Sequence, residues 1–435
     1  MPMATARRQR IVVAGAGFAG FQAARTLARL ARGAAEIVVI NPTDYFLYLP
    51  LLPEVTAGIL DPRRVAVPLA ALGRGVSPVL GEVESVDVEA RQVVHTDPEG
   101  TRSRTSYDRL VLAVGSVNKL LPVPGVAEHA HGFRSIGEAL YLRDHLLMQL
   151  ELAAAARDPD ERAARCTFVV VGAGYTGTEV AAQGQSLTRA AAARLPGLRG
   201  QPLRWLLVDL APRVLPGLDE RLAATAHDVL TGRGMDVRTG TTVKVATKEG
   251  VELSDGEFVP TRMLIWCVGV RPDPVVQGLG LPTVEGRLVV DEYLRVPGHP
   301  EVFACGDAAA VPDLTRPGEL TPMTAQHAYR QGKAVARNVA ASYGRGQARP
   351  YKHRDLGFVV DLGGADAAAN PLGVPLAGVA AKALTRGYHL SVIPGNRARI
   401  AADWALDALL PRQIVQLGLA YGPAASLAEK EPVPH

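Results

Sequence analysis

The sequence carries the same glycine pattern twice, and a short run rich in β-branched residues precedes it each time. Residues 11–14 lead into Gly15-Ala16-Gly17-Phe18-Ala19-Gly20, and residues 168–171 lead into Gly172-Ala173-Gly174-Tyr175-Thr176-Gly177. An alanine-rich segment without proline follows each pattern, which predicts a helix. Strand, G-x-G-x-x-G turn and helix in this order are typical of a Rossmann unit, whose turn holds a dinucleotide pyrophosphate. The chain is therefore predicted to be an α/β protein with two dinucleotide-binding domains.

The three glycines of each turn are expected to have different roles. The first (Gly15, Gly172) permits the tight turn, and the second (Gly17, Gly174) lets the backbone approach the pyrophosphate. The third (Gly20, Gly177) lets the helix pack close to the strand. Ala19 and Tyr175 belong to the same turns and are assigned to the same two sites. A single such turn occurs in any α/β sheet, but two correctly framed turns indicate two nucleotides.

A second predicted strand follows each helix, and its last residue bears on the choice of nucleotide. Residues 36–40 end at Asn41, and residues 205–208 end at Asp209. An acid at this point usually binds the ribose hydroxyls and repels a 2′-phosphate, so Asp209 favours NADH over NADPH, although Arg213 lies nearby. Asn41 can accept a hydrogen bond without a charge. One bound flavin, FAD, and one exchangeable NADH are therefore predicted, with the hydride chemistry supplied by these cofactors.

Further candidate cofactor contacts lie where predicted strands end in small residues. Residues 110–116 and 263–270 both end in this way, and residues 302–309 contain a Gly-Asp pair after which a helix is expected to begin. Asp307 is predicted to bind the ribityl hydroxyls of the flavin. The other residues assigned to the nucleotide sites are Val83, Ala113, Gly115, Gly269 and Gly306.

The composition excludes several other classes of protein. With 48% hydrophobic and 21% charged residues, the chain suits a globular protein with a large core. The sequence contains no stretch of about 18 consecutive uncharged apolar residues, so no membrane-spanning helix is predicted. Aromatic residues make up 5%, too few for a nucleic-acid stacking surface. Cys166, Cys267 and Cys305 have no C-x-x-C spacing, so no metal site is predicted, and the basic start of the chain is read as mature protein.

Residues 8–340 resemble the two-dinucleotide-binding-domain flavoproteins of the pyridine nucleotide-disulfide reductase superfamily. The resemblance implies that the NADH domain is inserted into the FAD domain. Residues 1–120 and 290–345 would form the FAD-binding domain, 121–289 the NADH-binding domain, and 346–435 a C-terminal α+β membrane-docking or dimer region. The redox-active C-x-x-x-x-C of the disulfide reductases is absent.

Three segments resemble the type II NADH:quinone oxidoreductases in particular: residues 45–58, 172–181 and 324–332. The resemblance implies that Glu179 is catalytic beside the nicotinamide and flavin, and that Gln326 lines the quinone pocket and contacts the flavin. It extends this role to His327, and it brings Lys382 toward the quinone entrance. Other readings stay open, because Glu179 suits a helix dipole, Gln326 an ordinary helix position, and His327 a satisfied histidine.

The Rossmann pattern ends near residue 351, and a basic, apolar region follows. Residues 355–364 predict a hairpin strand, residues 376–384 a helix, and residues 404–419 a further apolar surface. From residue 320 onward there are 13 Lys and Arg against 7 Asp and Glu, which suits an anionic membrane surface. The resemblance implies docking at the cytoplasmic face of a bacterial cell membrane. Packing on the protein's own core and a homodimer interface are the alternatives.

The resemblance implies a respiratory-chain, FAD-dependent oxidoreductase that passes a hydride from NADH to FAD and two electrons on to a quinone. Three alternatives stay open at this point. They are a soluble NAD(P)H-dependent flavoprotein reductase with another acceptor, an enzyme like the sulfide:quinone oxidoreductases, which carry sulfur on cysteines, and an NADH-responsive binding module. No nucleic acid is expected as a partner.

Overall fold

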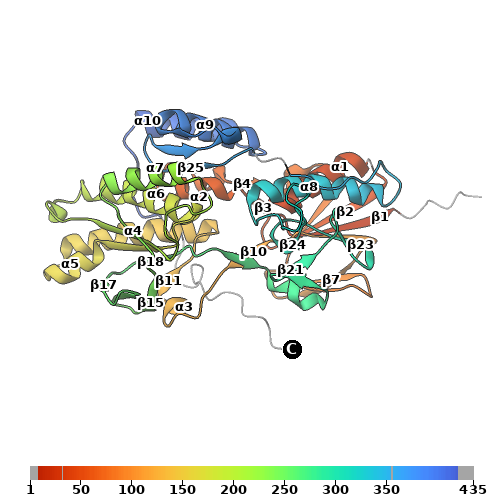
Figure 1. Cartoon of the computed structure of the whole chain (residues 1–435), viewed down its shortest axis with the longest axis horizontal. Coiled ribbons are helices and arrows are strands. Elements are labelled where there is room, and N and C mark those ends of the chain that lie inside the picture. Colours follow the sequence, from red (N-terminus) through yellow and green to blue (C-terminus); the bar gives the residue numbers. More distant parts are fainter. Residues whose placement is uncertain (1–7, 32, 354–355, 420–435) are drawn as a thin grey trace, which may run out of the picture. The chain divides into compact units, whose positions relative to one another are not determined.

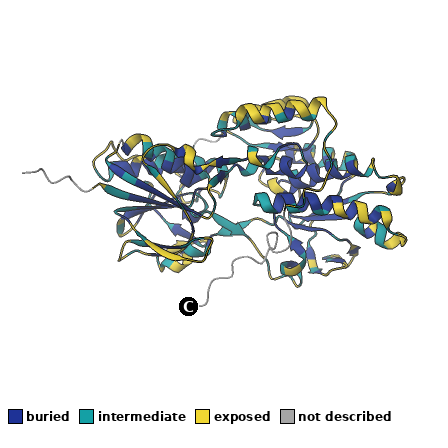
Figure 2. Cartoon of the chain, turned by 180° about the vertical axis from the view of Figure 1, so that it is seen from behind, coloured by how far each residue is buried: buried dark blue, intermediate teal, exposed yellow. Residues whose placement is uncertain are grey.

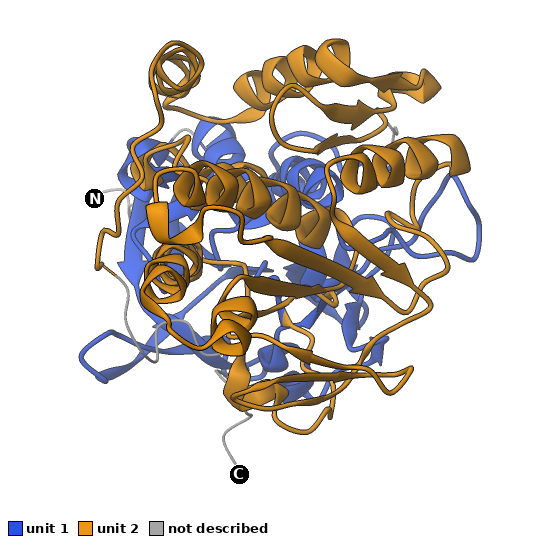
Figure 3. Cartoon of the chain, turned by 90° about the vertical axis from the view of Figure 1, so that its left-hand side faces the viewer, with its two compact units in different colours: residues 1–47, 66–117, 270–354 blue, residues 48–65, 118–269, 355–435 orange. Residues whose placement is uncertain are grey.

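The computed structural model describes residues 8–31, 33–353 and 356–419, and the chain forms two compact units (Figure 3). Unit 1 comprises residues 1–47, 66–117 and 270–354, and unit 2 comprises residues 48–65, 118–269 and 355–435. The chain thus returns to unit 1 at residue 270, whereas the expected FAD-binding domain resumes at residue 290. The three-domain division stays a prediction. The start of the chain, Asp355 and residues 420–435 lie outside the described residues.

Unit 1 is built on a six-stranded sheet with the strand order β22-β23-β9-β1-β2-β5. All neighbours pair in parallel except β22 and β23. The inner strands are almost wholly apolar, as parallel strands buried on both faces require. The bounds are β1 Gln9–Ala14, β2 Ala35–Asn41, β5 Val76–Leu80, β9 Arg109–Leu112, β22 Arg295–Val296 and β23 His299–Ala304.

Two helices, α1 (Phe18–Ala31) and α8 (Ala325–Ala341), lie side by side in unit 1 (Figure 1). They approach closely because Gly332 has no side chain. A Cβ at this position would overlap the carbonyl oxygen of Ala19. Smaller sheets complete the unit: β3 (Tyr45–Leu47) with β4 (Ala66–Pro68), β6 (Glu82–Asp87) with β7 (Gln92–Thr96) and β8 (Arg102–Ser106), and β20 (Thr283–Val284) with β21 (Arg287–Val289) and β24 (Ala309–Ala310). Strands β10 (Ser116–Asn118) and β19 (Val270–Pro272) form a two-stranded sheet where the chain passes between the units.

Unit 2 is built on a five-stranded parallel sheet with the order β11-β18-β12-β13-β14. A three-stranded antiparallel sheet, β15-β16-β17, packs its apolar residues into the same core. The bounds are β11 Ala130–His131, β12 Thr167–Val171, β13 Arg204–Asp209, β14 Asp236–Thr239, β15 Val243–Ala246, β16 Gly250–Leu253, β17 Phe258–Pro260 and β18 Leu264–Trp266.

The helices of unit 2 begin at recognisable caps. Helix α4 starts with a capping box in which Ser135 and Glu138 satisfy each other's backbone N–H groups, and Asp219 caps α7. The bounds are α2 Leu52–Thr56, α3 Val126–His129, α4 Ile136–Ala155, α5 Pro159–Arg165, α6 Tyr175–Ala192 and α7 Glu220–Gly232. A loop with the 3-10 turn Pro196–Leu198 separates α6 from β13.

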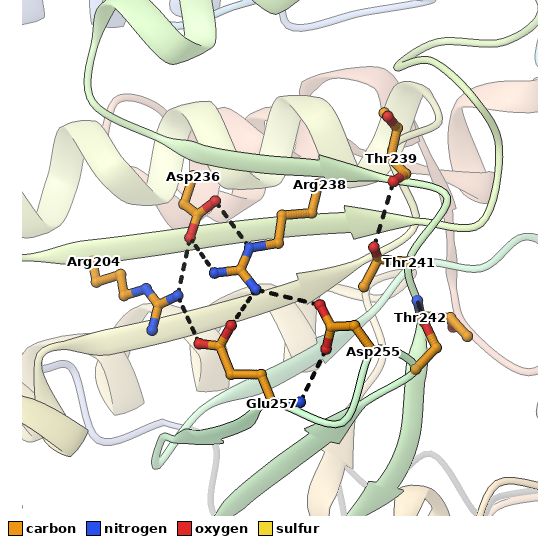
Figure 4. Close-up of polar contacts among 9 residues, drawn as sticks. Arg204, Asp236, Arg238, Thr239, Thr241, Thr242, Asp255 and Glu257 are labelled. Carbon is orange, nitrogen blue, oxygen red and sulfur yellow. Dashed lines mark hydrogen bonds and ion pairs between the residues drawn. The ribbon is translucent and has the colours of Figure 1, made fainter.

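An ion-pair network ties the edge of the five-stranded sheet to the antiparallel sheet (Figure 4). Arg204 of β13 contacts Asp236 at 3.0 Å and Glu257 at 3.3 Å. Arg238 of β14 pairs with the same two carboxylates and lies 3.8 Å from Asp255. Hydrogen bonding by Arg238 lowers the pKa of Glu257. Because these side chains are partly exposed, each pair contributes about 1 kcal/mol or less.

The C-terminal part of unit 2 is α+β, as the sequence predicted. A three-stranded antiparallel sheet, β25 (Val359–Asp361), β26 (Ala367–Ala369) and β27 (Leu376–Ala377), packs against α9 (Gly378–Val392). The predicted hairpin is confirmed, and the predicted helix begins at Gly378 rather than at 376, because residues 376–377 pair with β26. Helix α10 (Arg397–Leu409) follows.

Apolar side chains are exposed on the last two helices and just beyond them. Val379 is 71% exposed and Leu409 is 80% exposed, and Leu406, Leu410 and Val415 are exposed as well. Figure 2 shows this exposed face in yellow on α9 and α10. Within the part of the chain that the structure describes, no helix has both the length and the apolar character needed to span a bilayer.

Candidate redox site with two nucleotide turns

The first glycine turn, in unit 1, has the geometry that a pyrophosphate site needs. Gly15 adopts φ +92°, and a Cβ there would overlap the carbonyl of Ala113, while a Cβ on Gly20 would overlap the carbonyl of Gly15. Gly17 has no atom within 4 Å of its would-be Cβ, so the backbone there is open. The open glycine stands just before the N-terminus of α1, where backbone N–H groups attract an anion.

The second glycine turn, in unit 2, repeats this geometry. Gly172 adopts φ +100° against the carbonyl of Cys267, and a Cβ on Gly177 would overlap the carbonyl of Gly172. Gly174 again faces open space and directly precedes α6. The exposed ring of Tyr175 begins that helix. In each turn, therefore, the fold requires the first and third glycines, and the second faces open space that a ligand could occupy.

The strand-end residues Asn41 and Asp209 anchor these turns. The Asn41 carboxamide oxygen accepts the backbone N–H of Ala16 at 2.8 Å, and the Asp209 carboxylate accepts that of Ala173 at 2.5 Å. The other Asp209 oxygen accepts the N–H of Ala211 at 2.8 Å. The two side chains thus have the same structural task, and only Asp209 brings a charge to it.

Several other candidate residues gather in unit 1 near the first turn. Ala113 donates its N–H to Ala14 at 2.8 Å, which places the end of β9 beside the end of β1. Asp307 accepts the hydroxyl of Ser116 at 2.6 Å. Gly115 and Gly306 adopt positive φ, and Val83 lies buried in β6. Gly269, in unit 2 directly before β19, likewise has φ +100°.

The prediction of a helix after the Gly306-Asp307 pair is wrong. Residues Gly306–Ala308 form a single 3-10 turn, and the chain continues directly into β24. Pairing of β24 with β21 favours the extended conformation from residue 309 onward. The sequence predicted two helix N-termini in unit 1 that could attract the pyrophosphate, and only that of α1 is present. Gln331, on α8, instead accepts the Gly306 N–H at 2.7 Å and holds this turn.

Gln326 and His327 lie in the first turn of α8 in unit 1. Gln326 is half-buried, and Thr324 caps the helix by accepting the His327 N–H at 3.3 Å. The His327 ring is buried, lies 3.2 Å from the Tyr351 hydroxyl through Nδ1, and stacks on His353 with 3.7 Å between ring centres. These contacts support the reading of His327 as a satisfied histidine.

Glu179, on α6 of unit 2, is half-buried and belongs to a group of charged residues whose other members are buried. One Glu179 oxygen accepts the backbone N–H of Asp361 at 3.0 Å, and Asp361 forms an ion pair with Lys382 of α9. Burial raises the pKa of Glu179 to about 8. A carboxyl that is neutral at pH 7 does not serve a helix dipole, so the environment favours a proton-holding role.

Besides Asp361, the sequence reasoning missed Glu54, Trp404 and His389 as members of this group. Glu54 of α2 is fully buried, and burial, with Asp361, raises its pKa to about 7. Trp404 of α10 donates its indole N–H to Glu54 at 2.5 Å. His389 contacts the Tyr48 hydroxyl at 3.1 Å, and burial lowers its pKa to about 4. The one local signal was a single carboxylate within the apolar run Leu51-Leu52-Pro53-Glu54-Val55.

The three cysteines have the character of inert core residues. Cys166 and Cys305 are buried and Cys267 is partly buried, with no disulfide among them. Burial raises the pKa of Cys166 to about 11 and those of Cys267 and Cys305 to about 12. Since the thiolate is the reactive form, these thiols disfavour the reading as a sulfur-carrying enzyme.

Comparison with known proteins defines the class to which this fold and these turns belong. A model of the family described as "Pyridine nucleotide-disulphide oxidoreductase" matches residues 9–332, and the chain belongs to this family. The predicted fold class, with two dinucleotide-binding Rossmann units, is thereby confirmed.

Within the family, the chain belongs with the type II NADH:quinone oxidoreductases, as predicted. It is 31% identical over 428 residues to "Type II NADH:quinone oxidoreductase Ndh" of Mycobacterium tuberculosis, covering 94% of this chain and 89% of that protein. "Demethylphylloquinone reductase NdbB" of Synechocystis is 30% identical, covering 92% and 96%. A solved structure of NDH2 from Plasmodium falciparum in complex with NADH superposes with a TM-score of 0.87 at 18% identity, covering 94% of this chain and all of that one, which shows the shared fold.

Proposed function

We propose that this chain oxidises NADH and reduces a quinone by means of a bound FAD. The observation that carries the proposal is the pair of Rossmann turns, each with an open middle glycine and a strand-end anchor. When bound, the flavin accepts a hydride from NADH and passes two electrons on to the quinone. The residues of the chain bind and orient the nucleotides and hold protons.

The proposed FAD site lies in unit 1. Gly17 leaves room for the pyrophosphate, and the N-terminus of α1 favours its negative charge. Asp307, already an acceptor for Ser116, has the carboxylate oxygens to bind ribityl hydroxyls. The remaining residues of the proposed site are Gly15, Ala19, Gly20, Asn41, Val83, Ala113, Gly115 and Gly306, with Gln326 and His327 on the α8 side.

The proposed NADH site lies in unit 2, and its charge favours NADH over NADPH. Gly174 leaves room for the pyrophosphate, and the Asp209 carboxylate would repel a 2′-phosphate. Arg213 donates hydrogen bonds to the carbonyls of Pro216 and Leu218 within its own loop, both at 3.3 Å. These bonds hold its guanidinium in the loop, where it is less available to bind a 2′-phosphate. Gly172, Tyr175, Gly177 and Gly269 complete the proposed site.

Gln326 and Glu179 are the proposed catalytic residues toward the quinone. The reaction consumes one proton besides the hydride, since NADH, a proton and the quinone yield NAD⁺ and the quinol. Glu179, whose pKa is raised to about 8, holds a proton at pH 7 and can give it up. The Gln326 amide can donate a hydrogen bond to a quinone carbonyl.

The apolar face of α9 and α10 is the proposed membrane-docking surface. Exposed Val379, Leu406, Leu409 and Leu410 lie in or next to these helices, and the chain from residue 320 onward carries 13 Lys and Arg against 7 Asp and Glu. An apolar face with basic residues suits the anionic surface of a bilayer. We therefore infer a peripheral protein at the cytoplasmic face of the membrane, with a homodimer as the competing use of this surface.

A steady-state assay tests this proposal. Purified yellow protein is expected to oxidise NADH slowly alone and rapidly with a short-chain quinone, and to use NADPH less well. Gln326→Ala and Glu179→Ala should each lower quinone turnover by about tenfold or more at unchanged melting temperature. Equal NADH oxidation with and without quinone would refute the acceptor, and unchanged rates in both variants would remove these two roles.

A further inference from the structure

Glu54 is a buried carboxyl for which the proposed reaction has so far no use. It is 2% exposed and lies on α2, which packs against both α4 and α6. Trp404 donates to Glu54 Oε2 at 2.5 Å, whereas Oε1 has no hydrogen-bond partner among the described residues. An ionised carboxylate with one neutral donor is poorly compensated in the interior of a protein.

Glu138, another buried glutamate of unit 2, shows how a structural carboxylate is satisfied. Its Oε2 accepts the backbone N–H groups of Arg134 and Ser135, both at 2.7 Å, and it belongs to the capping box of α4. Backbone donors at a helix N-terminus favour the anion. Glu54 also lies in the first turn of its short helix, but it accepts no backbone N–H among the described residues, so its surroundings favour the neutral acid.

No cation forms an ion pair with Glu54 among the described residues, although the charges of Lys382 and Arg386 act to lower its pKa. Lys382 forms its ion pair with Asp361, and the Arg386 guanidinium lies 4.8 Å from the centre of the Trp404 ring. Arg64 pairs with Asp403 at 2.8 Å. The helices packed against α2 carry further titratable groups: α6 has Tyr175, Glu179 and Arg189, and α4 has Glu138, Tyr141, Arg143, Asp144, His145 and Glu151. His389 lies on α9.

The same nearby charge, that of Lys382, stabilises the ionised forms of both Glu54 and Glu179, and it does not offset the effect of burial on either. Burial, together with Asp361, raises the pKa of Glu54 to about 7. Burial raises the pKa of Glu179 to about 8, and the charge of Glu54 is among the causes. His389 brings no positive charge to the group at neutral pH, because burial lowers its pKa to about 4.

We propose, on the basis of the function proposed above, that Glu54 is a positioning residue for Glu179: the buried carboxyl of Glu54 and the half-buried carboxyl of Glu179 ionise one at a time, so the group keeps one proton at neutral pH. Two like charges in a shared site of low dielectric ionise in separate steps. The retained proton supplies the one that quinone reduction consumes beyond the hydride. It is released from Glu179 for uptake by the reduced quinone, and the pair regains a proton from solvent.

Infrared titration of the FAD-loaded protein tests this directly, because the C=O stretch of a protonated carboxyl is read without turnover. The variants are Glu54→Gln, Glu179→Gln and, as a matched change of a buried glutamate outside the group, Glu138→Gln. Glu54→Gln should remove one band and lower the titration midpoint of the Glu179 band by about one pH unit. Glu138→Gln should change neither band. An unchanged Glu179 midpoint in Glu54→Gln would overturn the proposal.

Two further measurements separate this role from a structural one and from the function itself. Trp404→Phe removes the hydrogen bond that lowers the pKa of Glu54, so the Glu54 band should persist to higher pH, and an unmoved band would contradict the proposal. The alkaline limb of quinone turnover should move to lower pH in Glu54→Gln. If the original protein reduces quinone and Glu54→Gln has the same pH profile of turnover, the role of Glu54 is overturned but the proposed function stands. Absence of NADH–quinone turnover in the original protein would overturn the proposed function as well.

Discussion

The backbone N–H of Ala173 donates to the Asp209 carboxylate at 2.5 Å, which ties the second Rossmann turn to the end of the next strand. In unit 1 a neutral side chain, Asn41, makes the corresponding bond to Ala16 at 2.8 Å. A carboxamide thus suffices to anchor such a turn. The charge of Asp209 is therefore available for choosing the nucleotide, and mutation can separate the two tasks.

Asp209→Asn should keep the Ala173 bond that anchors the turn, lose the bond from Ala211, and weaken NADH binding. We expect the KM for NADH to rise by about tenfold, because a hydrogen bond from a ribose hydroxyl to a charged acceptor is replaced by one to a neutral acceptor. The kcat should change little, and the preference for NADH over NADPH should fall. Asp228→Asn, an exposed change on α7, is the control. A large drop in melting temperature with unchanged nucleotide preference would show that Asp209 is only an anchor.

The two classes of glycine in the second turn should respond differently to alanine. Gly174 has φ −74° and open space for a Cβ, so Gly174→Ala should fold normally and lose NADH affinity. Gly172→Ala should lower the free energy of unfolding by about 2 kcal/mol or more, because φ is +100° and the Cys267 carbonyl occupies the space. Chemical denaturation and NADH titration of both variants check this. Full NADH affinity in Gly174→Ala would argue against a pyrophosphate at that turn.

The raised pKa of Glu179 makes stability depend on pH in a defined direction. Its folded-state pKa, about 8, lies above the usual 4.5, so its contribution to stability is fully present below pH 4.5. That contribution is lost as the pH rises through about 8. Glu179→Gln should therefore become more stable relative to the original protein between pH 5 and 9, by a few kcal/mol at most. Denaturant titrations at several pH values measure the difference, and a constant difference would contradict the raised pKa.

The exposed leucines at the end of α10 should matter for membranes and not for turnover on a water-soluble quinone. Leu409→Asp should weaken binding to vesicles that contain phosphatidylglycerol by about thirtyfold, because one buried leucine contributes roughly 2 kcal/mol. The melting temperature should be unchanged, since Leu409 is 80% exposed. Equal sedimentation, with a loss of dimer in analytical ultracentrifugation, would assign this surface to a second copy of the chain.

The two Rossmann turns could be predicted from the sequence because their constraint is local. Gly15 and Gly172 require positive φ, and the neighbouring strand and helix patterns are read within about thirty residues. The helix expected after Asp307 was wrong because β24 is set by pairing with β21, some twenty positions earlier in the chain. Such pairing is a long-range choice that no local pattern contains.

The buried charged group could be predicted only in part. Glu179 and Lys382 were found through the resemblance, but Glu54, Asp361 and His389 come from distant segments that meet only in the folded unit. The isolated carboxylate of Glu54 in an apolar run is equally compatible with a turn at the surface. Its burial depends on the packing of α2 against α4 and α6 and on Trp404 of α10, which the sequence does not specify locally.

Anaerobic double-mixing stopped-flow spectroscopy tests the central claim most directly. NADH mixed with the oxidised yellow protein should bleach the flavin absorbance near 450 nm within about a second, and a quinone added next should restore it just as rapidly. Rapid bleaching followed by rapid recovery is the result expected of an NADH:quinone oxidoreductase. Flavin that is not bleached by NADH, or reduced flavin that persists in the presence of quinone, would contradict the account.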